Sequence, residues 1–334
     1  MKVYPLHVGD TRVPYGQFYG GSGNDWVGWR AAWRFMTDRS HNIIVPIYAF
    51  LIDHPRAGLI LIDAGINWDM AHAHRQYYQR WGWRLITDED EYRLTRPQEL
   101  AAQVKRLGYS VEDIESVVLT HLHEDHLGGL REVPQARVVL SLDAWNSKNL
   151  GVFSWREWSP SFTFATAEVI TFSSGPFHSF DSSQDLLGDG SIILLPTPGH
   201  ADGHLSVLVR MAGYELLITG DVIYTLRHLD FEQVRQIMLG KRMREQQIDS
   251  IRRIRRLREV LPGTVVLPSH DHTTYQSRLL EIFLADGELS DQERQEIATY
   301  EARLFTENWH LAPAALPHFV EAQDSGNVGS VAEP

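Results

Sequence analysis

Short apolar runs, each bounded by turn-forming residues, recur along most of the chain. Residues 43–52 and 59–62 form two such runs. The segment between them, residues 53–58, contains Asp, Pro and Gly, so we predict a β-hairpin. Further runs with the length and boundaries of strands lie at residues 114–119, 137–142, 191–195, 205–210, 214–219 and 264–267. The pattern therefore predicts a strand-rich chain.

Helical periodicity is confined to a few longer segments. Residues 97–107 begin with proline and are followed by Gly108, which is typical of the two ends of a helix. Residues 231–260 have a helical pattern that ends before Pro262 and Gly263, and a polar, aromatic segment of helical character extends to about residue 96. A charged helix is expected at residues 290–305.

Two regions have no clear periodicity. Residues 1–42 mix glycine, aromatic and polar residues, which predicts a loop-rich region with one or two edge strands. Residues 145–183 are aromatic and rich in serine, and we expect them to form part of a wall that faces the substrate. Trp26, Trp29 and Trp33 have the spacing of a helix core, although the wall of an apolar ligand cleft would need such side chains.

Composition and length are those of an ordinary soluble globular protein, with 334 residues of which 43% are hydrophobic and 22% charged. A net charge of -12 argues against a nucleic-acid partner, because such partners are bound by clustered basic side chains. The main basic cluster, residues 252–258, has apolar residues at helical spacing and is interpreted as one solvated face of a helix.

The chain contains no cysteine, which excludes disulfides, thiolate ligands and a cysteine nucleophile. Any metal ion must therefore be held by nitrogen and oxygen atoms. The N-terminus has no apolar signal region, and no later segment approaches the length needed to span a bilayer. We expect a cytoplasmic protein without a membrane partner.

Four potential metal ligands lie within six residues, directly after the apolar run 114–119. Gly128 and Gly129 follow and let the backbone turn sharply at close quarters, so we expect a strand-to-helix loop, where chemistry is often placed. The alternative is a polar surface loop whose side chains only cap the next helix. The four residues are His121, His123, Asp125 and His126.

Three further polar motifs each follow a strand-like run. They contain His200 in Pro-Gly-His, Asp221 in Gly-Asp and His270 in Pro-Ser-His. Because the strands of a sheet end along one edge, these residues could converge there with the first cluster. Five imidazoles and two carboxylates are enough for two metal ions bridged by one aspartate and one hydroxide.

In this order the motifs resemble those of the metallo-β-lactamase fold superfamily, whose members carry H-x-H-x-D-H, a lone His, a bridging Asp and a last His. The resemblance spans roughly residues 43–275 and implies an α/β fold, a four-layer αββα sandwich, here with a C-terminal extension. We predict a hydrolase domain at residues 1–285 and a helical extension with a frayed tail at residues 286–334. By resemblance, one metal ion would be held by His121, His123 and His200 and the other by Asp125, His126 and His270, with Asp221 bridging.

Within the superfamily, the segment from Asp221 to Tyr224 resembles N-acyl-homoserine lactonases of the quorum-quenching type. In these, a tyrosine three residues after the bridging aspartate points its hydroxyl at the lactone. The resemblance implies that a metal-bridging hydroxide attacks the lactone carbonyl and opens the ring, since two divalent ions lower the pKa of a shared water. Tyr224 would hydrogen-bond to the carbonyl or the developing oxyanion, and Asp125 would pass a proton to the leaving alkoxide.

Several positions have more than one interpretation. His204 could replace His200 as a ligand, but the family pattern uses the first His after Pro-Gly, so we expect His204 to be a donor behind the ligands or a core histidine. Asp63 is either the strand-end aspartate that supports the metal loop in this superfamily or a turn residue bonded to the local backbone. Tyr224 could be only a half-buried aromatic residue.

Two remaining residues are not expected to be ligands. His272 is predicted to lie outside the immediate surroundings of the metal ions. Glu124, which the family pattern leaves unassigned, is predicted to be dispensable for metal binding.

The leading hypothesis is therefore a dinuclear metal hydrolase that opens an acylated lactone, an N-acyl-homoserine lactone, with Zn²⁺ as the default metal and Fe, Co or Mn as alternatives. A related hydrolase of phosphoesters, thioesters or other esters would use the same chemistry. A non-catalytic sensing or binding module that keeps its metal ions is the rival from another class. A homodimer is possible through the aromatic N-terminal region or the C-terminal segment.

Overall fold

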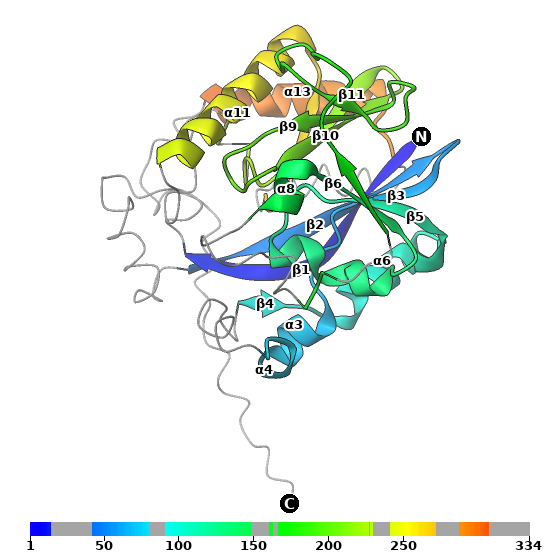
Figure 1. Cartoon of the computed structure of the whole chain (residues 1–334). Helices are drawn as coiled ribbons and strands as arrows, with labels where there is room; N and C mark the ends of the chain where they lie inside the picture. The colour runs from blue at the N-terminus through cyan, green and yellow to red at the C-terminus, as the bar shows by residue number, and fades with distance from the viewer. Residues whose placement is uncertain are drawn as a thin grey trace, which may run out of the picture.

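The computed structural model describes residues 1–14, 42–79, 91–147, 160–162, 166–226, 228–229, 241–271 and 287–306. In these ranges the chain forms two mixed β-sheets that pack face to face, with helices on both outer sides (Figure 1). The predicted α/β sandwich of four layers is therefore confirmed. The predicted tryptophan series, His272 and residues 231–240 of the predicted long helix lie outside the described residues.

The first sheet has seven strands and contains the predicted hairpin. β2 and β3 are antiparallel, as are the pairs that β1 forms with β2 and with β4, whereas the strands from β3 to β7 are parallel. In spatial order the strands are β4 (Tyr92–Arg93), β1 (Lys2–Pro14), β2 (Asn42–His54), β3 (Gly58–Ile62), β5 (Ile114–Val118), β6 (Arg137–Ser141) and β7 (Thr166–Ile170).

The second sheet has five strands, of which β11 and β12 pair in parallel while the other neighbouring strands are antiparallel. In spatial order the strands are β12 (Val265–Pro268), β11 (Tyr214–Gly220), β10 (Leu205–Met211), β9 (Ile192–Pro196) and β8 (Gln184–Asp185).

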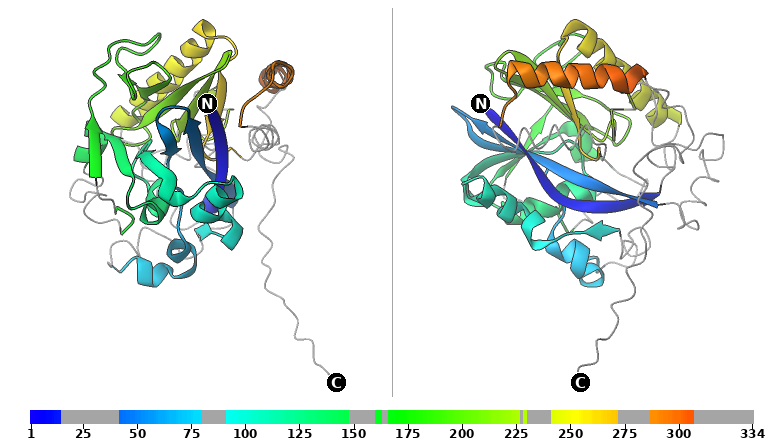
Figure 2. Two further views of the ribbon diagram at one scale, coloured as in Figure 1. Left: turned by 90° about the vertical axis from the view of Figure 1, so that its right-hand side faces the viewer. Right: turned by 180° about the vertical axis from the view of Figure 1, so that it is seen from behind.

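Helices cover the outer face of each sheet. On the first sheet lie α3 (Trp68–His72), α4 (His74–Tyr77) and α6 (Leu100–Arg106), and on the second lie α11 (Lys241–Val260) and α13 (Asp291–Thr306) (Figure 1). Figure 2 shows the same layers from two further sides, with α13 running across the second sheet. The remaining helical turns are η2 (Arg96–Gln98), η3 (Val111–Asp113), α7 (Glu124–Leu127), η4 (Gly128–Glu132) and α8 (Leu142–Asn146).

The main core lies between the two sheets and continues under α11. Phe50 and Val118 of the first sheet and Leu208 of the second belong to one buried cluster. In α11, Ile254 and Leu257 are spaced by three residues and are buried in that cluster. The arginines between them face solvent, which agrees with the predicted solvated helix face.

Two local differences from the predictions have physical causes. The predicted helix at residues 97–107 is split into η2 and α6, because Glu99, which lies between them, has a non-helical ψ of 141°. The irregular stretch at residues 145–183 contains β7, in which every residue before Ile170 is exposed or half-buried, so the strand gives no apolar run. The described part of the N-terminal region, residues 1–14, contains β1, which agrees with the predicted edge strand except where β4 pairs with it.

The loops that carry the candidate ligands lie where the two sheets meet. The backbone N–H of Leu205 donates to Thr120 O at 2.9 Å, and that of Tyr48 donates to Ser269 O at 3.0 Å. After β5 the chain passes so close to the end of β3 that a Cβ on Gly129 would lie 2.2 Å from the carbonyl oxygen of Ala64. Glycine is needed there because the first cluster is pressed against the neighbouring strand.

The predicted extension is in contact with the rest of the chain. The N–H of Leu289 donates to the Tyr214 hydroxyl at 3.1 Å, and Arg294 donates to the carbonyl oxygen of Gly213 at 2.7 Å. The division of the chain at residue 285 stays a prediction. Among the described helices, none combines the length and apolar character that a bilayer crossing requires.

Candidate metal centre

The first cluster is held in place by Asp63, at the end of β3. Its carboxylate accepts hydrogen bonds from the N–H and the hydroxyl of Thr120, both at 2.8 Å, and from Nδ1 of His126 at 2.8 Å. Asp63 is buried and has a positive φ of 58°, a strained conformation that these three hydrogen bonds stabilise. Of the two interpretations of Asp63, the geometry favours the support of the metal loop.

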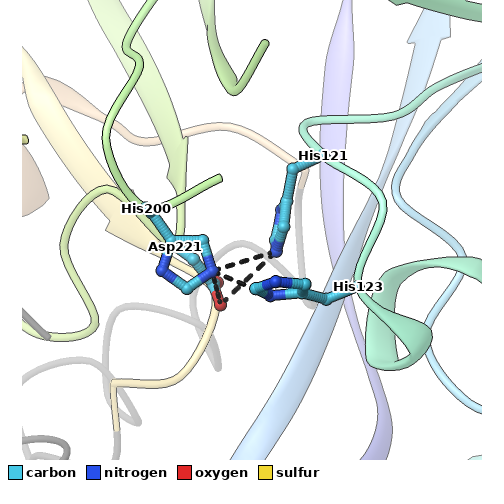
Figure 3. Close-up of side chains that lie close together, drawn as sticks. All are labelled: His121, His123, His200 and Asp221. Atoms are coloured by element: carbon cyan, nitrogen blue, oxygen red, sulfur yellow. Dashed lines mark hydrogen bonds and ion pairs between the residues drawn. The ribbon is translucent and has the colours of Figure 1, made fainter. Parts of the chain in front are cut away.

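Four side chains from three loops converge at one point (Figure 3). Nε2 of His200 lies 3.2 Å from Nε2 of His121 and 2.9 Å from Nδ1 of His123. Asp221 Oδ2 lies 3.4 Å from the same His200 nitrogen. The ligand atoms of this group all lie within 4.8 Å of one another.

A second group lies beside the first and shares Asp221 with it. Asp221 Oδ1 lies 3.3 Å from Nε2 of His126 and 3.3 Å from Nε2 of His270. Asp125 Oδ2 lies 3.4 Å from the same nitrogen of His270. One oxygen of Asp221 therefore faces each group, which is the arrangement expected of a bridging carboxylate.

In their neutral form, three of the histidines present an unprotonated Nε2 to the site. His126 donates from Nδ1 to Asp63, and His270 donates from Nδ1 to the carbonyl oxygen of Pro46 at 2.8 Å. Since the Thr120 hydroxyl is already donated to Asp63, it accepts from Nδ1 of His121 at 3.0 Å. In each neutral ring the proton is therefore on Nδ1, and Nε2 keeps its lone pair.

Buried atoms without hydrogen bonds show that the donor set fits a cation. His126 Nε2 and Asp221 Oδ1 are both buried and have no hydrogen-bond partner among the described residues, although they lie 3.3 Å apart. Two electron-pair donors held this closely in a buried site repel one another unless a positive charge lies between them. Imidazole nitrogens and carboxylate oxygens in such groups are ligands for divalent metal ions.

The pKa values reflect the same crowding of charge. Burial, reinforced by the neighbouring imidazoles, holds the pKa of His121 well below its ordinary value. Burial also lowers the pKa of His126 and His270, but the carboxylates around them, above all Asp221, outweigh this and raise both. The pKa of Asp221 is correspondingly well below its usual range, because His270 and His126 outweigh its burial. The second group therefore attracts a positive charge, as a proton or as a metal ion.

Tyr224 lies at the edge of the first group. Its hydroxyl is 3.3 Å from Nδ1 of His200, whose Nε2 faces the site. The tyrosine is buried in a small apolar cluster with Val45. The loop that carries it is held by two acceptors, since Nδ1 of His228 accepts from the N–H of Tyr224 and Asp271 accepts from that of Leu226.

The structure brings together all seven predicted ligands, and it places His200, not His204, in the first group. His204 is buried behind Asp221, and burial lowers its pKa to about 3. Which of these side chains bind metal stays a prediction.

Sequence reasoning missed the residues that hold the loops. Asp271 directly follows His270 and could have been noticed from its position in the motif. Gln247 and Ser250 of α11 donate to the carbonyl oxygens of Val222 and Pro198, at 3.0 and 2.8 Å, and no local pattern marks them.

Glu124 belongs to neither group of candidate ligands among the described residues. Its Oε2 accepts a hydrogen bond from the Ser161 hydroxyl at 2.7 Å and one from the Tyr78 hydroxyl at 3.4 Å. The carboxylate is buried, so it joins the metal loop to α4 and to residues 160–162.

We predict that Glu124→Ala leaves the metal content of the protein unchanged and lowers the free energy of unfolding by about 1–3 kcal/mol, because two buried hydroxyls lose their acceptor. Glu124→Gln, which keeps one acceptor oxygen, should cost less. Metal analysis and denaturant titration would check both. A loss of bound metal in the correctly folded Gln variant would contradict the prediction.

The fold and the site together correspond to a known family. A model of the Metallo-beta-lactamase superfamily matches residues 42–289, and the chain belongs to this superfamily. Among its relatives is the N-acyl homoserine lactonase AttM of Agrobacterium fabrum, which is 30% identical over 244 residues, covering 68% of this chain and 82% of the relative.

Solved structures with the same fold are similar over most of the chain. One is an N-acyl homoserine lactone hydrolase with the product N-hexanoyl-L-homoserine at its catalytic metal center, with a TM-score of 0.61, 18% identity and coverage of 83% of this chain and 95% of that chain. Another is the dizinc quorum-quenching lactonase AidC in complex with a product, with a TM-score of 0.51, 15% identity and coverage of 80% and 86%. At these identities the likeness is one of fold.

Proposed function

We propose that the chain is a dinuclear metal-dependent hydrolase that opens the ring of N-acyl-homoserine lactones. The observation that carries the proposal is the pair of ligand groups that share Asp221, with the Tyr224 hydroxyl at the edge of the first group. The names of AttM and of the two lactonase structures support the substrate class.

We further propose that His121, His123 and His200 hold one metal ion, that Asp125, His126 and His270 hold the other, and that Asp221 bridges them. Zn²⁺ is the proposed metal, since a donor set of nitrogen and oxygen atoms suits it and AidC is named as a dizinc enzyme. When bound, two such ions would lower the pKa of a shared water towards neutrality and polarise the substrate carbonyl.

The residues of this chain then have distinct roles in ring opening. Tyr224 donates a hydrogen bond to the lactone carbonyl oxygen, on which negative charge develops as the water oxygen bonds to the carbonyl carbon. The ring C–O bond breaks, and the leaving alkoxide needs a proton. Asp125 is the carboxylate of the site that is most open to solvent, with 16% of its side chain exposed, and it passes the proton from the attacking water to the alkoxide. The product is the open hydroxy acid.

Tyr224→Phe tests the proposed role of the hydroxyl. We expect kcat for N-acyl-homoserine lactone hydrolysis to fall by about 10²–10³-fold, the usual effect of removing one donor to an oxyanion, while the metal content is retained. A matched control is Tyr109→Phe, because the Tyr109 hydroxyl donates to Asp53 at 2.8 Å, far from the site in the fold, and its loss should leave kcat unchanged.

A panel of lactones, thioesters and phosphoesters, assayed on zinc-loaded protein, tests the substrate class. Unchanged lactone turnover in Tyr224→Phe, together with much faster hydrolysis of a thioester or phosphoester, would favour the related hydrolase. Two bound metal ions without hydrolysis of any substrate would favour the sensing module.

We also propose the division into a hydrolase domain at residues 1–285 and an extension at residues 286–334. The described part of the extension, residues 287–306, contains α13, which packs on the second sheet through Ile297. The cytoplasmic location, the homodimer and the exclusion of nucleic-acid and membrane partners stay predictions.

A further inference from the structure

His204 lies directly behind the proposed metal centre and belongs to neither ligand group. Its Nε2 accepts a hydrogen bond from the backbone N–H of Asp221 at 3.0 Å. The ring is buried and lies 5.1 Å from the ring of His121, measured between centroids. The nitrogen that faces the centre is therefore engaged by the backbone of a ligand.

His204 belongs to a series of hydrogen bonds that begins and ends at backbone groups. These two backbone groups fix the direction of every hydrogen bond in the series. The Ser206 hydroxyl donates to the carbonyl oxygen of Thr219 at 3.0 Å, so its oxygen accepts from the Thr197 hydroxyl at 2.9 Å. The Thr197 oxygen must then accept from Nδ1 of His204, also at 2.9 Å. Nδ1 thus carries the ring proton, and Nε2 supplies the lone pair that accepts from Asp221.

Both ends of this series of hydrogen bonds lie in one turn, residues 219–221, at the end of β11. Gly220, between them, has a φ of 56°, and a Cβ on it would lie 2.9 Å from Nε2 of His204. The imidazole therefore fits directly against a turn that only glycine can form without strain. A closed loop of hydrogen bonds holds the turn from both sides.

Asp221 needs this precision more than the other ligands do. Its two oxygens face different groups, with Oδ2 at 3.4 Å from Nε2 of His200 and Oδ1 at 3.3 Å from Nε2 of His270. The side chain leaves the backbone next to the N–H that His204 holds. A rotation of the turn would displace both oxygens at once.

We propose that His204 is a positioning residue, which fixes the bridging carboxylate of Asp221 by accepting the backbone N–H of that residue. The inference rests on the proposed function, because it assumes the metal centre. Partners behind the ligands typically contribute about 10- to 100-fold to metal affinity. His204 acts only through Asp221 and does not touch the substrate.

The test is the affinity of the full chain for Zn²⁺, measured by competition with a chelating dye, together with the visible spectrum of the Co²⁺-loaded protein. His204→Phe keeps a ring but removes the acceptor, and we expect Zn²⁺ affinity to fall by about 10- to 100-fold and the Co²⁺ bands to shift. His204→Gln places an amide oxygen near the position of Nε2 and should recover most of the affinity.

Two further variants separate positioning from packing. Thr197→Val removes the acceptor that keeps the ring proton on Nδ1, with little change in volume, and it should cause a smaller loss of affinity; it also replaces His204→Phe if that variant fails to fold. His54 is the matched control, since its side chain is also buried from solvent and its Nδ1 accepts backbone N–H groups, from Arg56 and Ala57, in the distant β2–β3 turn. His54→Phe should lower stability without changing Zn²⁺ affinity.

The possible outcomes are distinct. Absence of Zn²⁺ binding by the wild-type chain would contradict the proposed metal centre itself. Wild-type binding with unchanged affinity in the folded His204 and Thr197 variants would overturn only the role of His204, as would a loss in His204→Phe that His204→Gln does not recover. The positioning role of His204 is supported if His204→Phe lowers Zn²⁺ affinity, His204→Gln restores it and His54→Phe leaves it unchanged.

Discussion

Replacement of Asp221 by alanine is expected to abolish lactone hydrolysis and to leave fewer than two metal ions on each chain. Asp221 is the residue that faces both ligand groups, with Oδ2 towards His200 and Oδ1 towards His126 and His270. A partner that only orients a ligand contributes about 10- to 100-fold, so we expect a shared ligand to cost more, about 10³-fold or greater in kcat. The measurements are metal content after dialysis and lactone turnover.

The loss of Asp221 also removes the charge that balances the second group. In the metal-free protein its carboxylate is a main cause of the raised pKa of His126 and His270. Without it, both pKa values should fall, because burial is then opposed by fewer carboxylates. Proton NMR of the histidine rings would show this change separately from activity.

Asp185→Ala is a matched control. Asp185 accepts backbone N–H groups from Gly188 and Gly190, at 2.9 and 2.8 Å, in a turn that contains none of the candidate ligands. Its replacement should destabilise that turn and leave metal content and turnover unchanged. Normal metal content and turnover in Asp221→Ala would contradict the proposed bridging role.

The sheets and the ligand groups could be predicted because each depends on a short stretch of sequence. The apolar runs that became β5, β9, β11 and β12 are buried, and each polar motif follows directly after one of them. A buried strand that ends at the edge of a sheet places the next residues at that edge. The convergence of remote histidines therefore follows from strand ends together with the packing of the two sheets, since β5 lies in the first sheet and β9, β11 and β12 lie in the second.

The supporting contacts could not be predicted, because they join segments that are distant in the chain. Glu124 is paired with Ser161 and Tyr78, and no local pattern marks either partner. His204 offered two roles from sequence, a donor behind the ligands or a core histidine, and the structure gives a third, an acceptor for a backbone N–H. Which ring nitrogen carries the proton depends on the neighbours in space.

Removal of the metal ions is expected to destabilise the protein, and the difference in stability between the metal-bound and the metal-free protein should grow as pH rises. A ligand that binds only the folded chain stabilises it by about 4 kcal/mol at a thousandfold excess over its Kd. The proposed ions must displace protons from the second group, because the pKa values of His126 and His270 are raised above the ordinary 6.5. Metal affinity should therefore increase with pH as these protons become easier to remove.

The sign follows from linkage in the metal-free protein. A histidine whose folded pKa is raised stabilises the folded chain below the unfolded value of 6.5, and this contribution is lost as pH rises through the folded value. His121 has the opposite shift: it stays neutral and has no proton to displace. As pH rises from the unfolded value of 6.5 through the raised folded pKa values of His126 and His270, their contribution to the stability of the metal-free protein is thus lost while metal binding becomes stronger.

Thermal unfolding with Zn²⁺ and with chelator, across that range, measures the difference directly. Calorimetric titration in two buffers of different ionisation enthalpy counts the protons released when the metal binds. His54→Gln should show the same pH dependence of the difference as the wild type, because His54 lies in the β2–β3 turn and contacts none of the candidate ligands. A difference that is constant or that shrinks with rising pH would mean that the ions do not replace protons on His126 and His270, and the assignment of the second ligand group would then be wrong.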